Sequence, residues 1–244
     1  MDYCDDFDNN IIEISTDIKH VLKKIKSKYI LTKIFNNLKE NRLLQMIKYN
    51  KKIQDILNIC LHHYKKYSEI DIEILPVSNK YGKFINIDKK EDESYFHIYF
   101  NNKDEEIKRN YFTAEDNVNK IRVKIDYQVK SFKELFNDCD CIGLINFINF
   151  KRNNITNMNS MFSLCSSLFK LNLSNYNTEK VTDMSYMFYK CSSLKKIDVA
   201  KFETENVINM SHMFSLCSSL NELNLSNFNT DKVKDMSYMF FGCS

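Results

Sequence analysis

This sequence of 244 residues contains three glycines, one proline and no tryptophan. So few glycines exclude the glycine-rich loops that hold phosphate groups in many nucleotide-binding proteins. The 35 basic and 32 acidic residues nearly balance, so bulk positive charge does not indicate a nucleic-acid partner. No apolar run reaches the length of a membrane-spanning helix, and the acidic start at 1–6 is not typical of a secretory signal. The composition, 43% apolar and 27% charged, is that of a globular protein and points to no particular chemistry.

The most informative feature is an internal repeat with a period of 26 residues. A short motif rich in methionine and phenylalanine recurs, and its copies begin at Met158, Met184, Met210 and Met236. A weaker copy one period upstream contains Phe136 and Cys139. We therefore divide residues 129–244 into a degenerate repeat at 129–154, full repeats at 155–180, 181–206 and 207–232, and a partial repeat at 233–244.

The spacing of apolar residues predicts two secondary-structure elements in each repeat. Met158, Met161, Phe162 and Cys165 have the spacing of one face of a short helix, and the leucines of 168–173 end in the alternation of a strand. A helix and a strand in every repeat predict a solenoid in which successive strands pair in parallel. We expect the repeated cysteines to lie in its core as free thiols, because stacked parallel side chains suit thiols better than disulfides.

Residues 1–128 do not repeat. The pattern is helical over 1–75 and changes over 76–128 to alternation, which predicts strands at 84–87, 95–100 and 121–125. We expect the small β region at 76–128 to cover the N-terminal end of the solenoid, whose core would otherwise be exposed.

The repeats resemble a known family. The segments MSYMFYKCSSL at 184–194 and NELNLSNFNT at 221–230 are similar to the MxxMFxxCxSLxxLxLSxFxT repeats of the BspA-like leucine-rich-repeat family. The resemblance covers residues 129–244 and implies a leucine-rich-repeat solenoid with a binding role and no catalytic residues. The predicted fold class is thus an α+β N-terminal region followed by an α/β leucine-rich-repeat solenoid. Many family members are surface proteins, but no signal peptide is evident here, so we expect a cytoplasmic protein, with the cell surface as the alternative.

A second resemblance lies in the N-terminal segment. The sequence YILTKIFNNL at 29–38, followed by LLQMI at 43–47, is similar to an F-box, whose helices dock the adaptor subunit of a ubiquitin ligase. It departs from that motif because Ser27-Lys28 stands where Leu-Pro is usual and no tryptophan follows. The alternative interpretation is a helical bundle whose apolar face forms an ordinary core.

Strand positions that alternate with the core positions are expected to form an exposed sheet face. The residues that we expect to bind a partner there are Leu144, Ile148, Phe169, Lys170, Asn172, Lys195, Lys196, Asp198, Glu222 and Asn224. These positions vary between repeats, whereas the core positions hardly do. Apolar side chains beside lysines also have the composition of a protein interface.

The leading hypothesis is a non-enzymatic module that binds a protein of unknown identity through this sheet face. The alternatives are an F-box-like substrate receptor of a ubiquitin ligase and a cell-surface adhesion protein. We expect no cofactor, no nucleic-acid partner and no metal, since Cys139-x-Cys141 lacks a second ligand pair and His62-His63 point apart on a helix. Because 233–244 supplies a repeat's helix without its strand, we expect either a longer array or end-to-end self-association.

Overall fold

The computed structural model describes residues 51, 53, 55, 68–87, 89–150 and 153–243. The chain divides into two compact units, Met1–Tyr67 and Ser68–Ser244. Nearly all described residues belong to the second unit. The F-box-like segments at 29–38 and 43–47, and the histidine pair at 62–63, lie outside the described residues.

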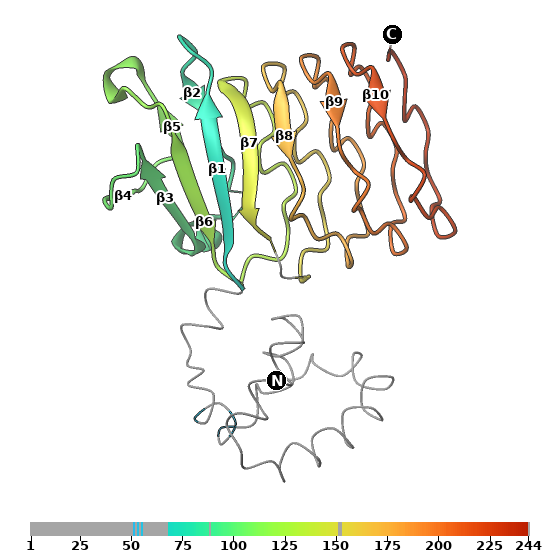
Figure 1. Ribbon diagram of the computed structural model, residues 1–244, viewed down its shortest axis with the longest axis horizontal. Helices are drawn as coiled ribbons and strands as arrows, with labels where there is room; N and C mark the ends of the chain where they lie inside the picture. Colours follow the sequence, from blue (N-terminus) through green and yellow to red (C-terminus); the bar gives the residue numbers. More distant parts are fainter. Residues whose placement is uncertain are drawn as a thin grey trace. The chain divides into compact units, whose positions relative to one another are not determined.

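The second unit begins with a mixed six-stranded sheet in the order β4-β3-β6-β1-β7-β8 (Figure 1). Its strands are β1 (Ile70–Pro76), β3 (Phe96–Phe100), β4 (Glu106–Ile107), β6 (Ile121–Ile125), β7 (Ile142–Asn149) and β8 (Lys170–Asn172). All neighbours are antiparallel except β7 and β8, which pair in parallel. The smaller elements nearby are β2 (Gly82–Lys83), which pairs with β5 (Tyr111–Phe112), and the 3₁₀ helices η1 (Lys90–Tyr95) and η2 (Ala114–Asp116).

Apolar and polar residues alternate along β1 and β6, so each strand buries one side. Ile70, Ile72 and Ile74 of β1 are fully buried. The polar residues that alternate with them form ion pairs on the opposite side of the sheet. Asp71 pairs with Arg122 and Glu69 with Lys124, both of β6, and Glu73 pairs with Lys120, which directly precedes β6. Burial of the isoleucine side fixes the register, because a slip of one residue would exchange the two faces.

Strands β3 and β6 confirm two of the three strands that the sequence predicts before the repeats. The strand expected at 84–87 is wrong. Phe84 and Ile85 are buried, but the segment makes single backbone bonds, from Phe84 N–H to the Asn110 carbonyl at 3.0 Å and from Asn86 N–H to the Leu135 carbonyl at 2.7 Å. The segment therefore packs against the first repeat instead of joining a sheet.

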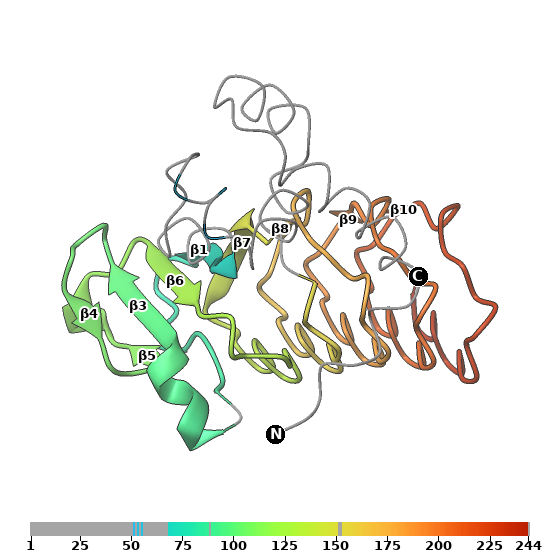
Figure 2. The ribbon, with the colours of Figure 1, turned by 90° about the horizontal axis from the view of Figure 1, so that it is seen from below.

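Successive repeats lie side by side in chain order over the rest of the unit (Figures 1 and 2). Parallel pairing at the 26-residue spacing is present between β7 and β8, and between β9 (Lys196–Ile197) and β10 (Glu222–Leu223). Isolated parallel bridges join the opposite part of each repeat, at Ser131, Asn157, Asp183, Asn209 and Asp235.

The predicted fold class is wrong, because no described residue of 129–243 lies in an α-helix and the expected helices are runs of turns. Their backbone N–H groups donate to the following repeat: Met158 to the Asp183 carbonyl and Ser160 to the Ser185 carbonyl, both at 2.9 Å. Ser160 has a φ of 55°, which a continuous helix does not allow. The unit is therefore a β-rich fold and not an α/β leucine-rich-repeat solenoid.

The core of the repeat region consists of like side chains stacked from repeat to repeat. The rings of Phe136, Phe162, Phe188, Phe214 and Phe240 form one column, with neighbouring centroids 5.3 to 5.8 Å apart and nearly parallel planes. The repeated cysteines form a second column of free thiols, of which Cys191 donates to the Phe162 carbonyl at 3.1 Å. This confirms the predicted burial of the Met, Phe and Cys positions in the full repeats, although not the predicted helix.

Candidate functional site

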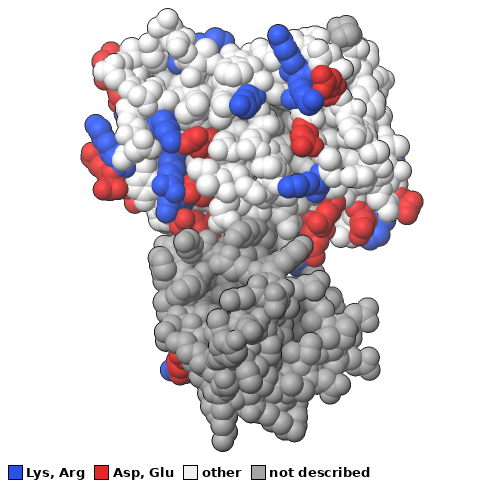
Figure 3. All heavy atoms as spheres, in the orientation of Figure 1, with Lys and Arg blue, Asp and Glu red and all other residues white. Residues whose placement is uncertain are grey.

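The predicted partner-binding residues lie at the exposed positions of strands β7 to β10 and the residues that flank them. All ten are exposed except Leu144, which is half-buried. Leu144 pairs with Lys170 and Asn146 with Asn172 in the β7–β8 register, and Lys196 pairs with Glu222 in the β9–β10 register. Figure 3 shows this side of the unit, where charged side chains flank a broad uncharged area.

Phe169 is the most exposed apolar side chain on this surface, at 59%. Its ring lies over Gly143, where an added Cβ would be 2.6 Å from the ring's Cε1 and 3.0 Å from Cγ2 of Val77. Gly143 itself is buried. The backbone is fixed as well, because Phe169 N–H donates to the Gly143 carbonyl at 3.0 Å. The aromatic ring is therefore exposed to solvent while it packs against the backbone at Gly143.

Two further apolar residues of β7 belong to the same surface. Ile148 is 43% exposed, and Leu144 is half-buried beside the strand that follows Phe169. We call Leu144, Ile148, Phe169, Lys170 and Lys195 the Phe169 face. Its apolar part comes from the first two repeats and its positive charge from the second and third.

The lysines on this side differ in their partners. Lys196 forms an ion pair with Glu222, and that hydrogen bond raises the pKa of Lys196 above its usual value. Lys170 and Lys195 form no ion pair with any other described residue. Their ammonium groups are thus available to an external carboxylate.

The predicted residues Asn172, Asp198 and Asn224 serve a structural purpose that sequence reasoning missed. Each side chain accepts a hydrogen bond from the backbone two residues later, from Ser174, Ala200 and Ser226 at 2.9 to 3.0 Å. This is the turn that Asn and Asp commonly stabilise. These three residues shape the end of each strand.

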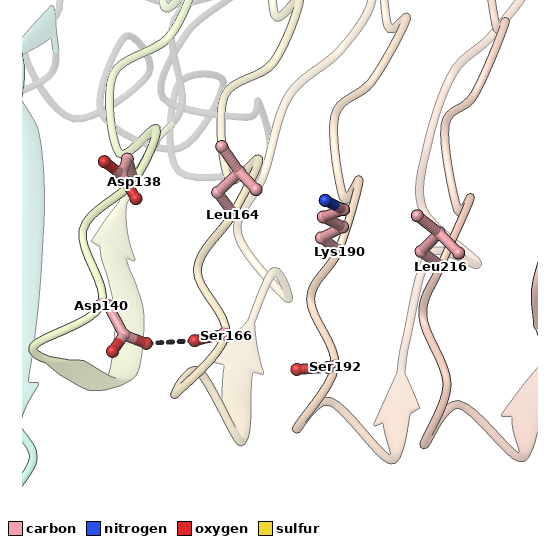
Figure 4. Close-up of a pocket in the computed structure, with 7 residues that line it drawn as sticks. All are labelled: Asp138, Asp140, Leu164, Ser166, Lys190, Ser192 and Leu216. Atoms are coloured by element: carbon pink, nitrogen blue, oxygen red, sulfur yellow. Dashed lines mark hydrogen bonds between the residues drawn. The ribbon is translucent and has the colours of Figure 1, made fainter.

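A shallow groove of about 380 Å³ lies elsewhere on the repeats, and the sequence did not indicate it. Figure 4 shows its two rows of side chains, which precede and follow the repeated cysteines: Asp138, Leu164, Lys190 and Leu216 in one row, and Asp140, Ser166 and Ser192 in the other. Asp140 is already occupied, since it accepts from Lys80 at 2.6 Å and from Ser167 at 2.7 Å. Burial opposes ionisation of this carboxyl, but these bonds hold its pKa below the usual value. The residues directly before and after the cysteines differ between repeats, and this variation is the only feature of the sequence that could have indicated the groove.

An aromatic cluster on the repeats was also missed. The ring of His212 lies between those of Tyr186 and Tyr238, with centroids 4.4 and 5.0 Å away and nearly parallel planes. Tyr189 and Phe241 meet this stack edge-on. The signal in the sequence is the aromatic character of the third position of the motif in the later repeats.

The described part of the chain offers no group of three His, Cys, Asp or Glu side chains that could hold a metal ion. No helix among the described residues is long and apolar enough to cross a membrane.

Comparison with known proteins finds a match for the repeat region alone. Residues 129–244 match the model of a family described as "Mycoplasma protein of unknown function, DUF285". No curated protein and no solved structure matches the chain. The region 129–244 is therefore similar to a repeat-bearing family of the BspA type, in agreement with the repeat resemblance found in the sequence.

Proposed function

We propose that this chain is a non-enzymatic module that binds another protein through the Phe169 face. The observation that carries the proposal is the exposed ring of Phe169 on its support at Gly143. Leaving a phenylalanine side chain in water forfeits about 2 kcal/mol of burial free energy, which a partner can recover by covering it. Exposed aromatic side chains of this kind are enriched in the central, well-packed part of protein interfaces.

The support under the ring favours binding further. A side chain that is already confined loses less rotamer freedom when a partner covers it, and this loss normally costs about 0.5–1.5 kcal/mol per side chain. Leu144 directly follows Gly143 on β7, and Ile148 is a second exposed apolar side chain four residues farther along that strand. The lysines beside the ring can supply polar contacts. An apolar centre with a charged border is the usual anatomy of an interface.

A comparison of two isoleucines provides a matched test. Ile148 on the Phe169 face and Ile208 outside it are exposed to nearly the same degree, 43% and 42%. The full chain and its Phe169→Ala, Ile148→Ala and Ile208→Ala variants would each be used to capture proteins from cells of the source organism, with quantification by mass spectrometry. We expect a protein that the wild type and Ile208→Ala retain and that the other two variants lose.

Direct binding of the purified candidate to the full chain must then reproduce this order. If every captured protein is retained equally by all four chains, the proposal is wrong. The thermal unfolding midpoints of the variants serve as the folding control.

A further inference from the structure

We infer that the partner segment that covers the Phe169 face is acidic and carries an apolar anchor residue. This inference rests on the proposed function and adds the chemistry of the partner. The anchor would cover the ring of Phe169, and one or two carboxylates beside it would pair with Lys170 and Lys195.

The positions of the two lysines support this assignment. Lys170 follows Phe169 directly in the chain, and it is exposed. Lys195 is 26 residues after Phe169, so it occupies the equivalent position in the next repeat. At this position backbone N–H groups donate to the preceding repeat, from Phe169 to the Gly143 carbonyl and from Asn221 to the Lys195 carbonyl. Neighbouring strands are about 4.8 Å apart, so both ammonium groups lie within a side chain's reach of the ring.

The charges around this point are largely neutralised from within the protein. Lys196 is paired with Glu222, and Asp71 and Glu73 on β1 are paired with Arg122 and Lys120. The carboxylate of Asp198, three residues after Lys195, accepts a hydrogen bond from Ala200 N–H. Lys170 and Lys195 thus remain the available charges next to the ring, and they complement an acidic ligand.

The number of unpaired lysines on the Phe169 face favours a peptide ligand over a nucleic acid. A protein that binds the phosphate backbone of a nucleic acid typically neutralises several phosphates with Lys and Arg, about six to ten in well-studied cases. Two ammonium groups beside a single aromatic ring do not provide such a track. They do suit an extended peptide, which advances about 3.3 Å per residue and so places a carboxylate one to three residues from the anchor near either lysine.

The probe is a library of random twelve-residue peptides displayed on phage and selected on the immobilised full chain. Peptides that also bind Phe169→Ala or Gly143→Ala would be removed by counter-selection. We expect the remaining peptides to contain Asp or Glu within three residues of a large apolar residue. Their affinity should fall about tenfold or more for the double variant Lys170→Glu/Lys195→Glu.

The matched control is Lys190→Glu/Lys234→Glu, which changes the net charge equally at two exposed lysines outside the Phe169 face. The affinity of this control for the selected peptides should stay within about twofold of the wild type when salt screens long-range electrostatic attraction. If the peptides depend on Phe169 but show no acidic bias, or tolerate Lys170→Glu/Lys195→Glu, the inference is wrong and the proposed function stands. If no selected peptide distinguishes the wild type from Phe169→Ala, both are wrong.

Discussion

The ring of Phe169 lies over Gly143, so a Cβ added at residue 143 would stand 2.6 Å from Cε1 of that ring. The backbone of Gly143 does not require glycine by a positive φ, so the ring is the principal obstacle. Gly143→Ala should therefore displace the ring while changing the free energy of unfolding by less than about 1 kcal/mol. Partner binding should weaken although Phe169 is retained. Calorimetric titration and thermal unfolding measure the two effects, and unchanged binding would show that the supported ring position does not matter.

Two phenylalanines in neighbouring repeats should respond very differently to truncation. Phe188 is fully buried and stacked between Phe162 and Phe214, whereas Phe169 is 59% exposed. Phe188→Ala should lower the free energy of unfolding by about 3–5 kcal/mol, because it leaves a cavity in the column. Phe169→Ala should change it by less than about 1 kcal/mol. Denaturant titration of both variants tests this, and a large loss for Phe169→Ala would mean that the assignment of the two faces is wrong.

The side chain of Asn86 should stabilise the start of the repeat region. Its amide donates to the carbonyls of Glu134 at 3.0 Å and Asn137 at 2.7 Å. Asn86→Ala leaves both carbonyls without this donor, and we expect a loss of about 1–3 kcal/mol. Asn221→Ala is the control, since Asn221 is exposed on the repeats and should cost less than about 0.5 kcal/mol. Equal unfolding midpoints for the two variants would contradict the importance of Asn86.

The buried thiols should make the protein less stable at alkaline pH. Burial raises the pKa of Cys217 to about 12, and it raises the pKa values of Cys165 and Cys191 well above the usual value. In the unfolded chain these thiols ionise near pH 8.5. Their protonated form in the fold therefore contributes fully below about pH 8.5, and the contribution is lost as pH rises further toward the raised values.

Each thiol should then cost up to about 1.4 kcal/mol for every pH unit above 8.5. Denaturant titrations at pH 8.0 and 9.5 would measure the slope. Cys191→Ala should show a smaller slope than the wild type, together with lower stability at neutral pH. A free energy of unfolding that is the same at both pH values would contradict the burial of these groups.

The core columns could be predicted from the sequence because a fixed period places like residues at like positions. Met184, Met187, Phe188 and Cys191 are all fully buried, as their spacing indicates. The helix could not be predicted correctly, since the same spacing also suits a run of turns whose N–H groups bond a segment 26 residues away. Asp183 illustrates this ambiguity: it directly precedes the motif at Met184, and its carboxylate accepts from Ser185 N–H at 2.9 Å in a turn.

The exposed strand positions were predictable from alternation, but the roles of their residues were not. Asn172 and Asp198 look like surface residues in the sequence, and their turn-forming bonds become visible only in the structure. The support of Phe169 by Gly143 joins residues 26 positions apart, and no local pattern encodes such a contact. The groove beside the cysteines likewise depends on side chains that different repeats bring together.

The most direct test of the proposed function is the dissociation constant of the purified partner for three full-length chains: the wild type, Phe169→Ala and Ile208→Ala. We predict that Phe169→Ala raises the Kd about tenfold or more, as expected for a central aromatic residue of an interface. Ile208→Ala should stay within about twofold of the wild type, and all three unfolding midpoints should agree. Equal Kd values for the wild type and Phe169→Ala would contradict binding through the Phe169 face.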